Sequence, residues 1–524
     1  RNMQRTAVAH GCQSIGSRRG SSSHQYNPAV IIADRDTTEE YGSCYGMVFV
    51  YSGNFLCEAE QDQYNQTRIM MGLQSDLFHY PLEAGETLTV PETILCYSSQ
   101  GFGGLSVKYH HCIRDHVCSG AYQHSPRPVL VNSWEAAYFH FNGETICQLA
   151  KDAAELGIDM VVMDDGWFGK REDDNSGLGD WQVNEKKLGC SLEELTKKVN
   201  EIGVKFGIWI EPEMVSEDSD LYRTHPDWAM LIPRRNPVRS RNQLVLDFSR
   251  EEVRDYIFEQ ICNVLDQGNI EYIKWDMNRS ISDVYSADNR QGKVAYDYVL
   301  GVYDFLEKLT AKYPHLLVEG CCGGGGRFDA GMLYYTPQIW CSDNTDALDR
   351  LRIHYGTSFF YPMSAIGAHV SAVPNHQTGR NIDLHTRGIV AMTGAFGYEL
   401  SLGKLTQEEK QKVKDQIRQY KAYEDLISDG DYYRLSNPFS DPYAAWMFVS
   451  KDRKKALLHV VMLESHGNMT VSYVKLKGLL PEASYEETES KRYYQGIALM
   501  QAGIPLPVEM KEYPAYQFLF QVKG

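Results

Sequence analysis

Two aspartates at the ends of strand-like runs have the clearest potential for chemistry in this chain. Asp276 ends the run that starts at Glu271, Asp343 ends the run that starts at Gln338, and an Asn follows each acid within two residues. A buried strand that presents an acid at its carboxyl end is how parallel barrels place catalytic groups. Two such acids predict the carboxylate pair of a glycosidase, one nucleophile and one proton donor. The alternative, that each Asp only caps a helix, is less favoured for the pair.

The neighbour of the first acid favours one role for it. Lys274 precedes Asp276 by two residues, so period-two alternation puts both side chains on one face of the strand. A nearby ammonium lowers the pKa of a carboxyl and keeps it ionised. A nucleophile needs that charge, whereas a proton donor must avoid it. Asp343 has no lysine at this spacing, so the sequence does not show what would raise its pKa.

Three further motifs could contact a ligand. Asp164 and Asp165 follow the apolar run Val161–Met163, and their four carboxylate oxygens could hold neighbouring sugar hydroxyls, although such a motif is also common in turns. Trp209 could be a platform for a sugar ring or an ordinary core residue. The four consecutive glycines at 323–326 lack the Lys-Ser/Thr of a phosphate loop. We therefore expect them to let the backbone approach a ligand closely.

The middle of the chain alternates strand-like with helix-like segments. The expected strands are Val129–Trp134, Met160–Trp167, Lys205–Glu211, Tyr272–Asn278, Leu316–Cys321, Gln338–Asp343, Tyr361–His369 and Ala395–Leu400. The expected helices include Glu144–Leu156, Leu192–Ile202, Arg250–Gln267, Ala295–Lys312, Leu384–Thr393 and an exposed closing helix at Thr406–Ala422. Eight such units predict an α/β fold, a (β/α)8 TIM barrel, over residues 126–428.

Short alternating β runs lie on both sides of this segment. They predict an N-terminal β-sandwich over residues 1–125 and a small C-terminal β-sandwich over residues 429–524. The net charge of −17 argues against a nucleic-acid or anionic-membrane partner, because both require a basic face. No apolar run is long enough to span a membrane.

The cysteines and one sequon bear on cofactors and compartment. The 12 cysteines form no C-x-x-C pair or His/Cys cluster with zinc spacing, so no zinc site is expected. Free thiols are typical of the cytoplasm. Asn278-Arg279-Ser280 is a glycosylation sequon directly after Asp276, and a glycan there would block the site. These observations predict a cytoplasmic protein.

Many motifs in order along the whole chain resemble those of glycoside hydrolase family 36, and most closely its bacterial α-galactosidases, the melibiases. The motifs are Met163-Asp-Asp-Gly-Trp-Phe-Gly169, Gly179-Asp-Trp181, Gly207-Ile-Trp-Ile-Glu-Pro-Glu213, Asn242-Gln-Leu-Val-Leu-Asp247, Ile273-Lys-Trp-Asp-Met-Asn278, Glu319-Gly-Cys321, Gly323-Gly-Gly-Gly-Arg-Phe-Asp329 and Trp340-Cys-Ser-Asp-Asn-Thr-Asp346.

The resemblance implies a retaining mechanism with Asp276 as nucleophile and Asp343 as acid/base. It implies that Asp164 and Asp165 bind the galactose 4- and 6-hydroxyls and that Lys274 binds a ring hydroxyl. By the same match, six further residues should border the galactose. These are Trp134, Trp209, Arg241, Asn278, Cys321 and Gly324.

The resemblance also sets expectations for cofactors, assembly and specificity. Family members need no metal or organic cofactor and are often tetrameric, so a homo-oligomer is expected. They usually carry a longer N-terminal β-sandwich, so this chain is expected to lack the first part of that domain. Cys322 stands where we expect a smaller or more polar residue and could alter specificity.

The sequence therefore predicts a retaining α-galactosidase acting on small α-galactosides such as melibiose and raffinose. The alternatives are an α-N-acetylgalactosaminidase, a galactosyl-transferring synthase on the same scaffold, or a non-catalytic galactoside-binding protein. The complete carboxylate pair argues against the last, because binding alone does not require an acid at both strand ends.

Overall fold

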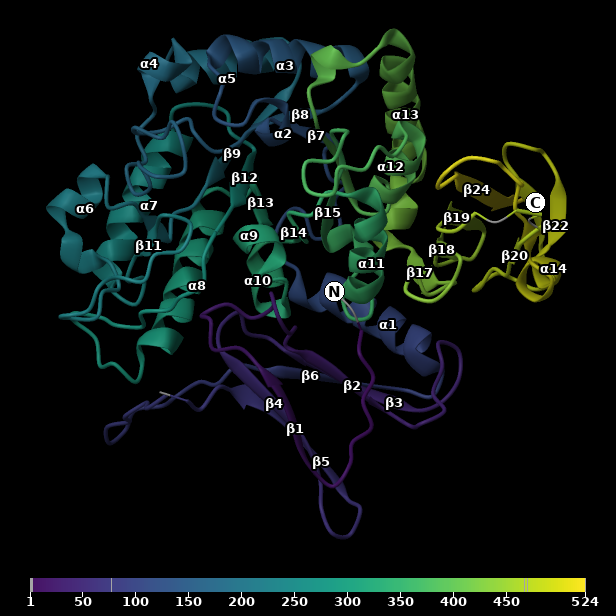
Figure 1. Ribbon diagram of the computed structural model, residues 1–524, viewed down its shortest axis with the longest axis horizontal. Helices are drawn as coiled ribbons and strands as arrows, with labels where there is room; N and C mark the ends of the chain where they lie inside the picture. Colours follow the sequence, from purple (N-terminus) through teal and green to yellow (C-terminus); the bar gives the residue numbers. More distant parts are fainter. Residues whose placement is uncertain (1–2, 77, 466, 469, 524) are drawn as a thin grey trace.

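A closed barrel of eight parallel strands forms the centre of the protein, and its last strand pairs back onto its first. The structure, a computed structural model, describes residues 3–76, 78–465, 467–468 and 470–523. In chain order the barrel strands are β7 (Leu130–Asn132), β8 (Met160–Met163), β9 (Lys205–Ile210), β12 (Tyr272–Trp275), β13 (Leu317–Gly320), β14 (Gln338–Trp340), β15 (Ile366–Ser371) and β16 (Ala395–Glu399). The predicted TIM barrel, with a sheet region on either side, is confirmed (Figure 1).

The seventh strand lies later in the chain than predicted. A strand was expected over Tyr361–His369, but the 3-10 turn Met363–Ala365 occupies its first half, and β15 starts only at Ile366. Pro362 explains the difference, because proline has no amide to donate to a sheet ladder and readily begins a helical turn. The expected apolar run is there, but only its second half is a strand.

Helices follow the barrel strands and cover the outside of the barrel. They are α3 (Gly143–Leu156), α5 (Leu192–Glu201), α7 (Glu251–Leu265), α8 (Val294–Lys312), α10 (Ala330–Tyr335), α11 (Ala347–Thr357), α12 (Leu384–Ala391) and α13 (Gln407–Asp429). In α3, the buried Ile146, Leu149, Ala150 and Ala153 recur at helical spacing and form the face that packs on the barrel. The closing helix α13 begins with a capping box between Thr406 and Glu409.

The N-terminal region contains two antiparallel sheets of three strands each. One has the order β1 (Gly11–Gly16), β4 (Phe55–Gln61), β5 (Thr67–Leu73), and the other β2 (Ala29–Ala33), β3 (Cys44–Phe49), β6 (Thr93–Ser98). Figure 1 shows both sheets below the barrel, on the side of α10 and α11. The division at residues 125/126 and 428/429 stays a proposal.

One helix interrupts the region that was expected to be all β. Helix α1 (Gly101–Cys112) continues as a π-helical turn, Ile113–Val117, and contacts β3, β6 and the C-terminal strand β17. Leu105, Tyr109 and Ile113 are spaced by four residues and fully buried, which is helical periodicity. Glycines at 101, 103 and 104 disfavour a helix and hid this pattern.

The C-terminal region is a six-stranded antiparallel sheet with a two-stranded ladder packed against it. The large sheet has the order β17 (Asp431–Arg434), β18 (Tyr443–Val449), β19 (Lys455–Met462), β24 (Ala515–Val522), β21 (Ser484–Glu487), β22 (Tyr493–Gln495), and the ladder pairs β20 (Tyr473–Val474) with β23 (Ile504–Pro505). Among the residues described, we find no helix with the length and apolar character needed to cross a bilayer.

Candidate active site

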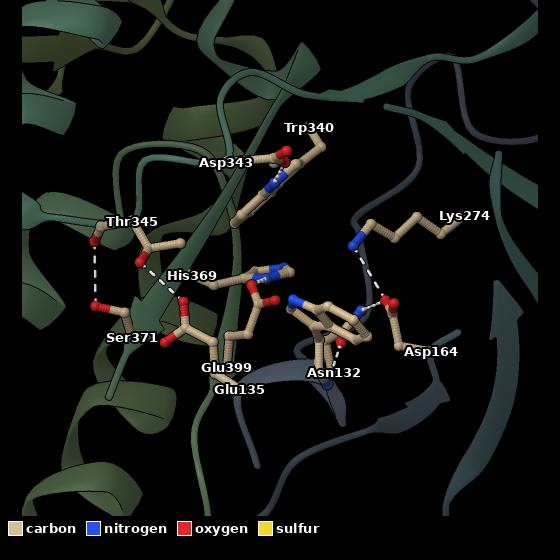
Figure 2. A network of polar contacts seen from close by, with 12 residues as sticks. Asn132, Glu135, Asp164, Lys274, Trp340, Asp343, Thr345, His369, Ser371 and Glu399 are labelled. Carbon is tan, nitrogen blue, oxygen red and sulfur yellow. Dashed lines mark hydrogen bonds and ion pairs between the residues drawn. The ribbon is translucent and has the colours of Figure 1, made fainter. Parts of the chain in front are cut away.

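The candidate acids of the barrel lie just beyond the carboxyl ends of its strands. Asp164 directly follows β8, Asp276 directly follows β12, and Asp343 comes three residues after β14. Neighbouring parallel strands end at the same edge of the barrel, so these acids gather at one face. Figure 2 shows Asp343, Lys274 and Asp164 around a common polar network.

Asp276 is surrounded by hydrogen-bond donors. Its Oδ1 accepts from the amides of Met277 at 2.8 Å and Gly323 at 2.9 Å. Its Oδ2 accepts from Asn278 Nδ2 at 2.8 Å and from the Trp209 indole at 3.2 Å. The side chain is only 6% exposed. Four donors aimed at one carboxyl stabilise its ionised form.

The charge on Lys274 acts on Asp276 without a direct bond. Burial alone would raise the pKa of Asp276, but the Lys274 ammonium and the hydrogen bonds together hold that pKa below its usual value. The ammonium Nζ itself lies 3.1 Å from Oδ2 of Asp164. The predicted neighbourhood of Lys274 and Asp276 is therefore present, but the hydrogen-bonded partner of the lysine is Asp164.

The two adjacent acids after β8 have different partners. Asp164 accepts from Asn132 Nδ2 at 2.7 Å as well as from Lys274. Asp165 forms a two-pronged ion pair with Arg171, with Nε–Oδ1 3.0 Å and Nη2–Oδ2 2.8 Å. Burial alone would lower the pKa of Arg171, but the charge of Asp165 raises it. Fixed partners on one side leave both carboxylates able to accept further hydrogen bonds from a ligand.

Asp343 has the opposite environment from Asp276. Among the described residues, the only donor to its carboxyl is the Trp340 indole, at 3.1 Å from Oδ1. Surrounding protein and the charge of Asp276 raise the pKa of Asp343. The side chain is nevertheless exposed, so solvent screens part of this effect. The causes of the raised pKa of Asp343, which the sequence did not show, are the surrounding protein and the tertiary approach of Asp276.

The glycine run fits between the two acids. Gly323 donates to Asp276, and Gly324 packs so closely on the second acid that a Cβ there would lie 2.3 Å from the Asp343 amide nitrogen. Both glycines have positive φ, +55° and +76°. We expected these glycines to admit a ligand. The close approach observed is between two stretches of backbone, and it places Gly324 beside Asp343.

The remaining predicted residues join the same group. Arg241 Nη1 lies 3.1 Å from Asn278 Oδ1. The Trp134 amide donates to Asn132 Oδ1 at 2.7 Å, which links it to Asp164. Cys321 is 3% exposed, and its Sγ accepts from the Gly324 amide at 3.4 Å. Neighbouring Cys322 is equally buried and packs in the main hydrophobic core.

Trp209 has features of a core residue and also contacts the site. It is 2% exposed and stacks on Phe168 with centroids 6.2 Å apart, as a core residue would. Its indole nitrogen points to Asp276. The structure thus places it beside the acid.

Glu211 is a site residue that sequence reasoning missed. It follows β9 directly, and its side chain accepts from Asn278 Nδ2 at 3.1 Å and from Gln243 Nε2 at 2.7 Å. Burial and the charge of Asp276 raise the pKa of Glu211 to about 8. Its position at a strand end, like that of Asp276, was the available signal. Asn132, Arg171 and Trp340 were also missed, and their roles depend on tertiary contacts.

No group of three or more His, Cys, Asp or Glu side chains in the described ranges could hold a metal ion. All 12 cysteines are free. The donors and acceptors that converge here are carboxylates, amides, one ammonium and indole N–H groups. Such a set can bind neutral hydroxyls and exchange a proton with them.

Comparison with known proteins agrees with this arrangement. The family model for melibiase matches residues 87–430, and the glycosyl hydrolase family 36 N-terminal and C-terminal domain models match residues 1–83 and 443–520. The chain belongs to glycoside hydrolase family 36. Its barrel and both flanking sheet regions are thus covered by models of one family, as the motif resemblance predicted.

Two relatives within family 36 show how far the similarity extends. The bifunctional α-galactosidase/sucrose kinase AgaSK of Mediterraneibacter gnavus is 66% identical over 99% of this chain. The α-galactosidase AgaA of Geobacillus stearothermophilus is 50% identical over 98% of it. The chain spans 55% of the length of the first and 70% of the second.

Solved family 36 structures share the fold closely. The galactosidase domain of AgaSK superposes with a TM-score of 0.98, covering 100% of this chain and 72% of that one. A variant of AgaA in complex with raffinose gives a TM-score of 0.98 at 48% identity, covering 100% of this chain and 73% of that one. Another AgaA variant is in complex with stachyose.

Proposed function

We propose that this protein is a retaining α-galactosidase that hydrolyses terminal α-galactosyl groups of oligosaccharides such as melibiose and raffinose. The observation that carries the proposal is a pair of carboxyls with opposite pKa shifts, lowered for Asp276 and raised for Asp343. A retaining glycosidase needs one ionised and one protonated carboxyl at the same pH. The relatives named α-galactosidases support the choice of sugar.

In the first half-reaction Asp276 attacks the anomeric carbon and forms an ester with it. Asp343 gives its proton to the glycosidic oxygen, the bond from that oxygen to the sugar breaks, and the aglycone leaves as an alcohol. In the second half-reaction water attacks the anomeric carbon, Asp343 takes the proton of the water, and Asp276 is released as a carboxylate. Two inversions at one carbon retain its configuration.

Three charged groups are proposed to read the galactose hydroxyls. Asp164 and Asp165 would accept from the 4- and 6-hydroxyls, and Lys274 would donate to a ring hydroxyl. All three are buried and already ion-paired with one another or with Arg171. A sugar that fails to hydrogen-bond to these groups leaves part of their buried hydrogen-bonding capacity unused, which is costly. The wrong 4-hydroxyl should therefore be rejected.

The residues proposed to border the galactose are Trp134, Trp209, Arg241, Asn278, Cys321 and Gly324. Their support is that each one contacts an acid of the site, or a residue that does, by a hydrogen bond or close packing. The homo-oligomeric state and the cytoplasmic location stay predictions from the sequence.

Turnover of p-nitrophenyl α-galactoside, with the anomer of the released galactose followed by NMR, tests the proposal. We expect hydrolysis with α-galactose as the first product. Binding without turnover would support a galactoside-binding protein instead, and β-galactose as first product would contradict the retaining mechanism.

The substituent at the 2-position separates the proposal from its main alternative. We expect α-galactosides to be strongly preferred over α-N-acetylgalactosaminides. The family resemblance places Cys321 and the following glycine run near the 2-hydroxyl, where a close backbone can hydrogen-bond a hydroxyl but leaves little room for an acetamido group. The two p-nitrophenyl substrates are compared under identical conditions. Equal or faster turnover of the N-acetylgalactosaminide would identify an α-N-acetylgalactosaminidase. Transfer of galactose to other sugars, when these are present at high concentration, would identify a galactosyl-transferring synthase.

A further inference from the structure

Within the described residues, the carboxyl of Asp343 accepts one hydrogen bond, and its donor is Trp340. The indole Nε1 donates to Oδ1 at 3.1 Å (Figure 2), and Trp340 is 2% exposed. An indole N–H can donate a hydrogen bond and cannot accept one. The contact therefore distinguishes the two oxygens of Asp343, because Oδ1 must act as an acceptor as long as this bond exists.

The Trp340 ring is held firmly in place. The guanidinium carbon of Arg350 lies 4.2 Å from the ring centroid, and the ring of His369 packs on it with centroids 4.6 Å apart. His369 Nδ1 in turn lies 3.3 Å from Oε2 of Glu399. Lys274 Nζ lies 5.7 Å from the ring centroid. A ring packed among these groups has no freedom to turn its N–H away from Asp343.

Arg350 also fixes the backbone on both sides of the acid. Its Nη2 donates to the Ser342 carbonyl at 2.6 Å, and its Nε donates to the Asn344 carbonyl at 2.7 Å. It is 4% exposed. One arginine thus holds the two residues that flank Asp343 and also stacks on Trp340. The position of the carboxyl relative to the indole is therefore determined by a single rigid unit.

We propose that Trp340 is a positioning residue that keeps Oδ1 of Asp343 as an acceptor, so that Oδ2 is the atom that gives and takes the catalytic proton. The proposal rests on the proposed function of Asp343 as acid/base. With the indole bound to Oδ1, a proton on the neutral acid is favoured on Oδ2, because a carbonyl oxygen accepts the indole N–H better than an acid hydroxyl oxygen does. The proton then faces one direction only, as a general acid requires.

When Oδ2 of Asp343 carries the catalytic proton, the protons balance in both half-reactions. The Oδ2–H bond breaks as the proton passes to the glycosidic oxygen, and its electron pair stays on Asp343 while the aglycone leaves. In the second half-reaction the same Oδ2 receives a proton from the attacking water. The Trp340 N–H is not transferred in either step. It stabilises the carboxylate after the proton has left.

The substitution Trp340→Phe tests the proposal, because it keeps an aromatic ring and removes the N–H. A lost hydrogen bond to a charged group corresponds to about a tenfold to hundredfold loss, which we expect in kcat/KM for raffinose. An activated aryl galactoside needs little acid assistance and should lose less than about threefold. The basic limb of the pH profile should move up by about one unit, since the carboxylate loses a donor.

Trp446→Phe is the matched control. Trp446 is also a buried tryptophan, 5% exposed, but it lies on β18 in the C-terminal sheet, and its Nε1 has no hydrogen-bond partner among the described residues. The Trp446→Phe substitution should leave unchanged both the ratio of kcat/KM for raffinose to kcat/KM for the aryl galactoside and the pH profile. An equal loss on both substrates in Trp340→Phe, or a basic limb that stays in place, would overturn the proposal.

A measurement on the intact protein keeps the test decisive if Trp340→Phe fails to fold. With 15N-labelled tryptophan, the protein's 8 indole signals can be followed as the pH changes. We expect one indole proton to lose its titration in Asp343→Asn, while the Trp209 indole, which donates to Asp276, keeps its own response to pH. If no indole signal responds to that substitution, the hydrogen bond is absent and the proposal is wrong. This result needs no turnover, so it is independent of the proposed function.

Discussion

The backbone amide of Gly323 donates a 2.9 Å hydrogen bond to Oδ1 of Asp276. The carbonyl of the same glycine lies 2.9 Å from Nε2 of His24, in the N-terminal region. The next residue, Gly324, packs against Asp343. The glycine run therefore contacts both acids and the N-terminal region.

Asp276→Ala should reduce turnover of all α-galactosides by at least about 10³-fold while galactose binding stays measurable, because the proposed nucleophile is lost. Azide should restore part of the activity and give a β-galactosyl azide, since it attacks from the face that the carboxylate has left. Product analysis by NMR distinguishes the anomers. An α-azide product, or near-normal activity, would show that Asp276 is not the nucleophile.

Asp343→Ala should lower kcat/KM for melibiose or raffinose by about 10²–10⁴-fold and affect activated aryl galactosides far less. The wild-type pH profile should be bell-shaped. The acidic limb reflects protonation of Asp276, whose pKa is lowered, and the basic limb reflects deprotonation of Asp343, whose pKa is raised. The basic limb should flatten in Asp343→Ala. The same loss of kcat/KM on both kinds of substrate would show that Asp343 is only a binding residue.

Asp164→Asn should weaken the discrimination between galactosides and glucosides. The wild-type protein should favour α-galactosides by at least about 100-fold in kcat/KM, because a glucoside leaves a charged acceptor without its 4-hydroxyl partner. Removing the charge lowers this cost, so the preference should shrink by about tenfold or more. Comparison of the two p-nitrophenyl glycosides gives the ratio. An unchanged ratio would mean that Asp164 does not read the 4-hydroxyl.

Gly324→Ala should impair both activity and stability, because the new Cβ would lie 2.3 Å from the Asp343 amide nitrogen and neither backbone can yield cheaply. Gly189→Ala is the matched control. Gly189 has nearly the same φ, +74° against +76°, but nothing lies within 4 Å of its added Cβ. Backbone strain of about 1–3 kcal/mol should appear in both variants, and loss of turnover only in Gly324→Ala. Thermal unfolding and kcat/KM separate the two effects.

Several features could be predicted from sequence because they are local. All eight barrel strands were expected, because strands buried on both faces are continuous apolar runs. The strand-end positions of Asp276 and Asp164 followed from the same runs. The start of β15 and the helix α1 could not be predicted well, because Pro362 and three glycines blurred the patterns that mark these elements.

The sequence by itself determined the barrel, the acids at its strand ends and, through its motifs, the family. Only the tertiary structure decided which groups act on those acids. The donors from Gly323, Trp209 and Trp340 reach Asp276 and Asp343 from other strands or through the turn of a loop. The two contacts to Asp276 depend on the pairing of neighbouring barrel strands, which brings together strand ends that lie far apart in the chain. The Trp340 contact spans three residues and depends on the turn that follows β14. The spacing of residues in the sequence does not show how close residues from different strands lie in space.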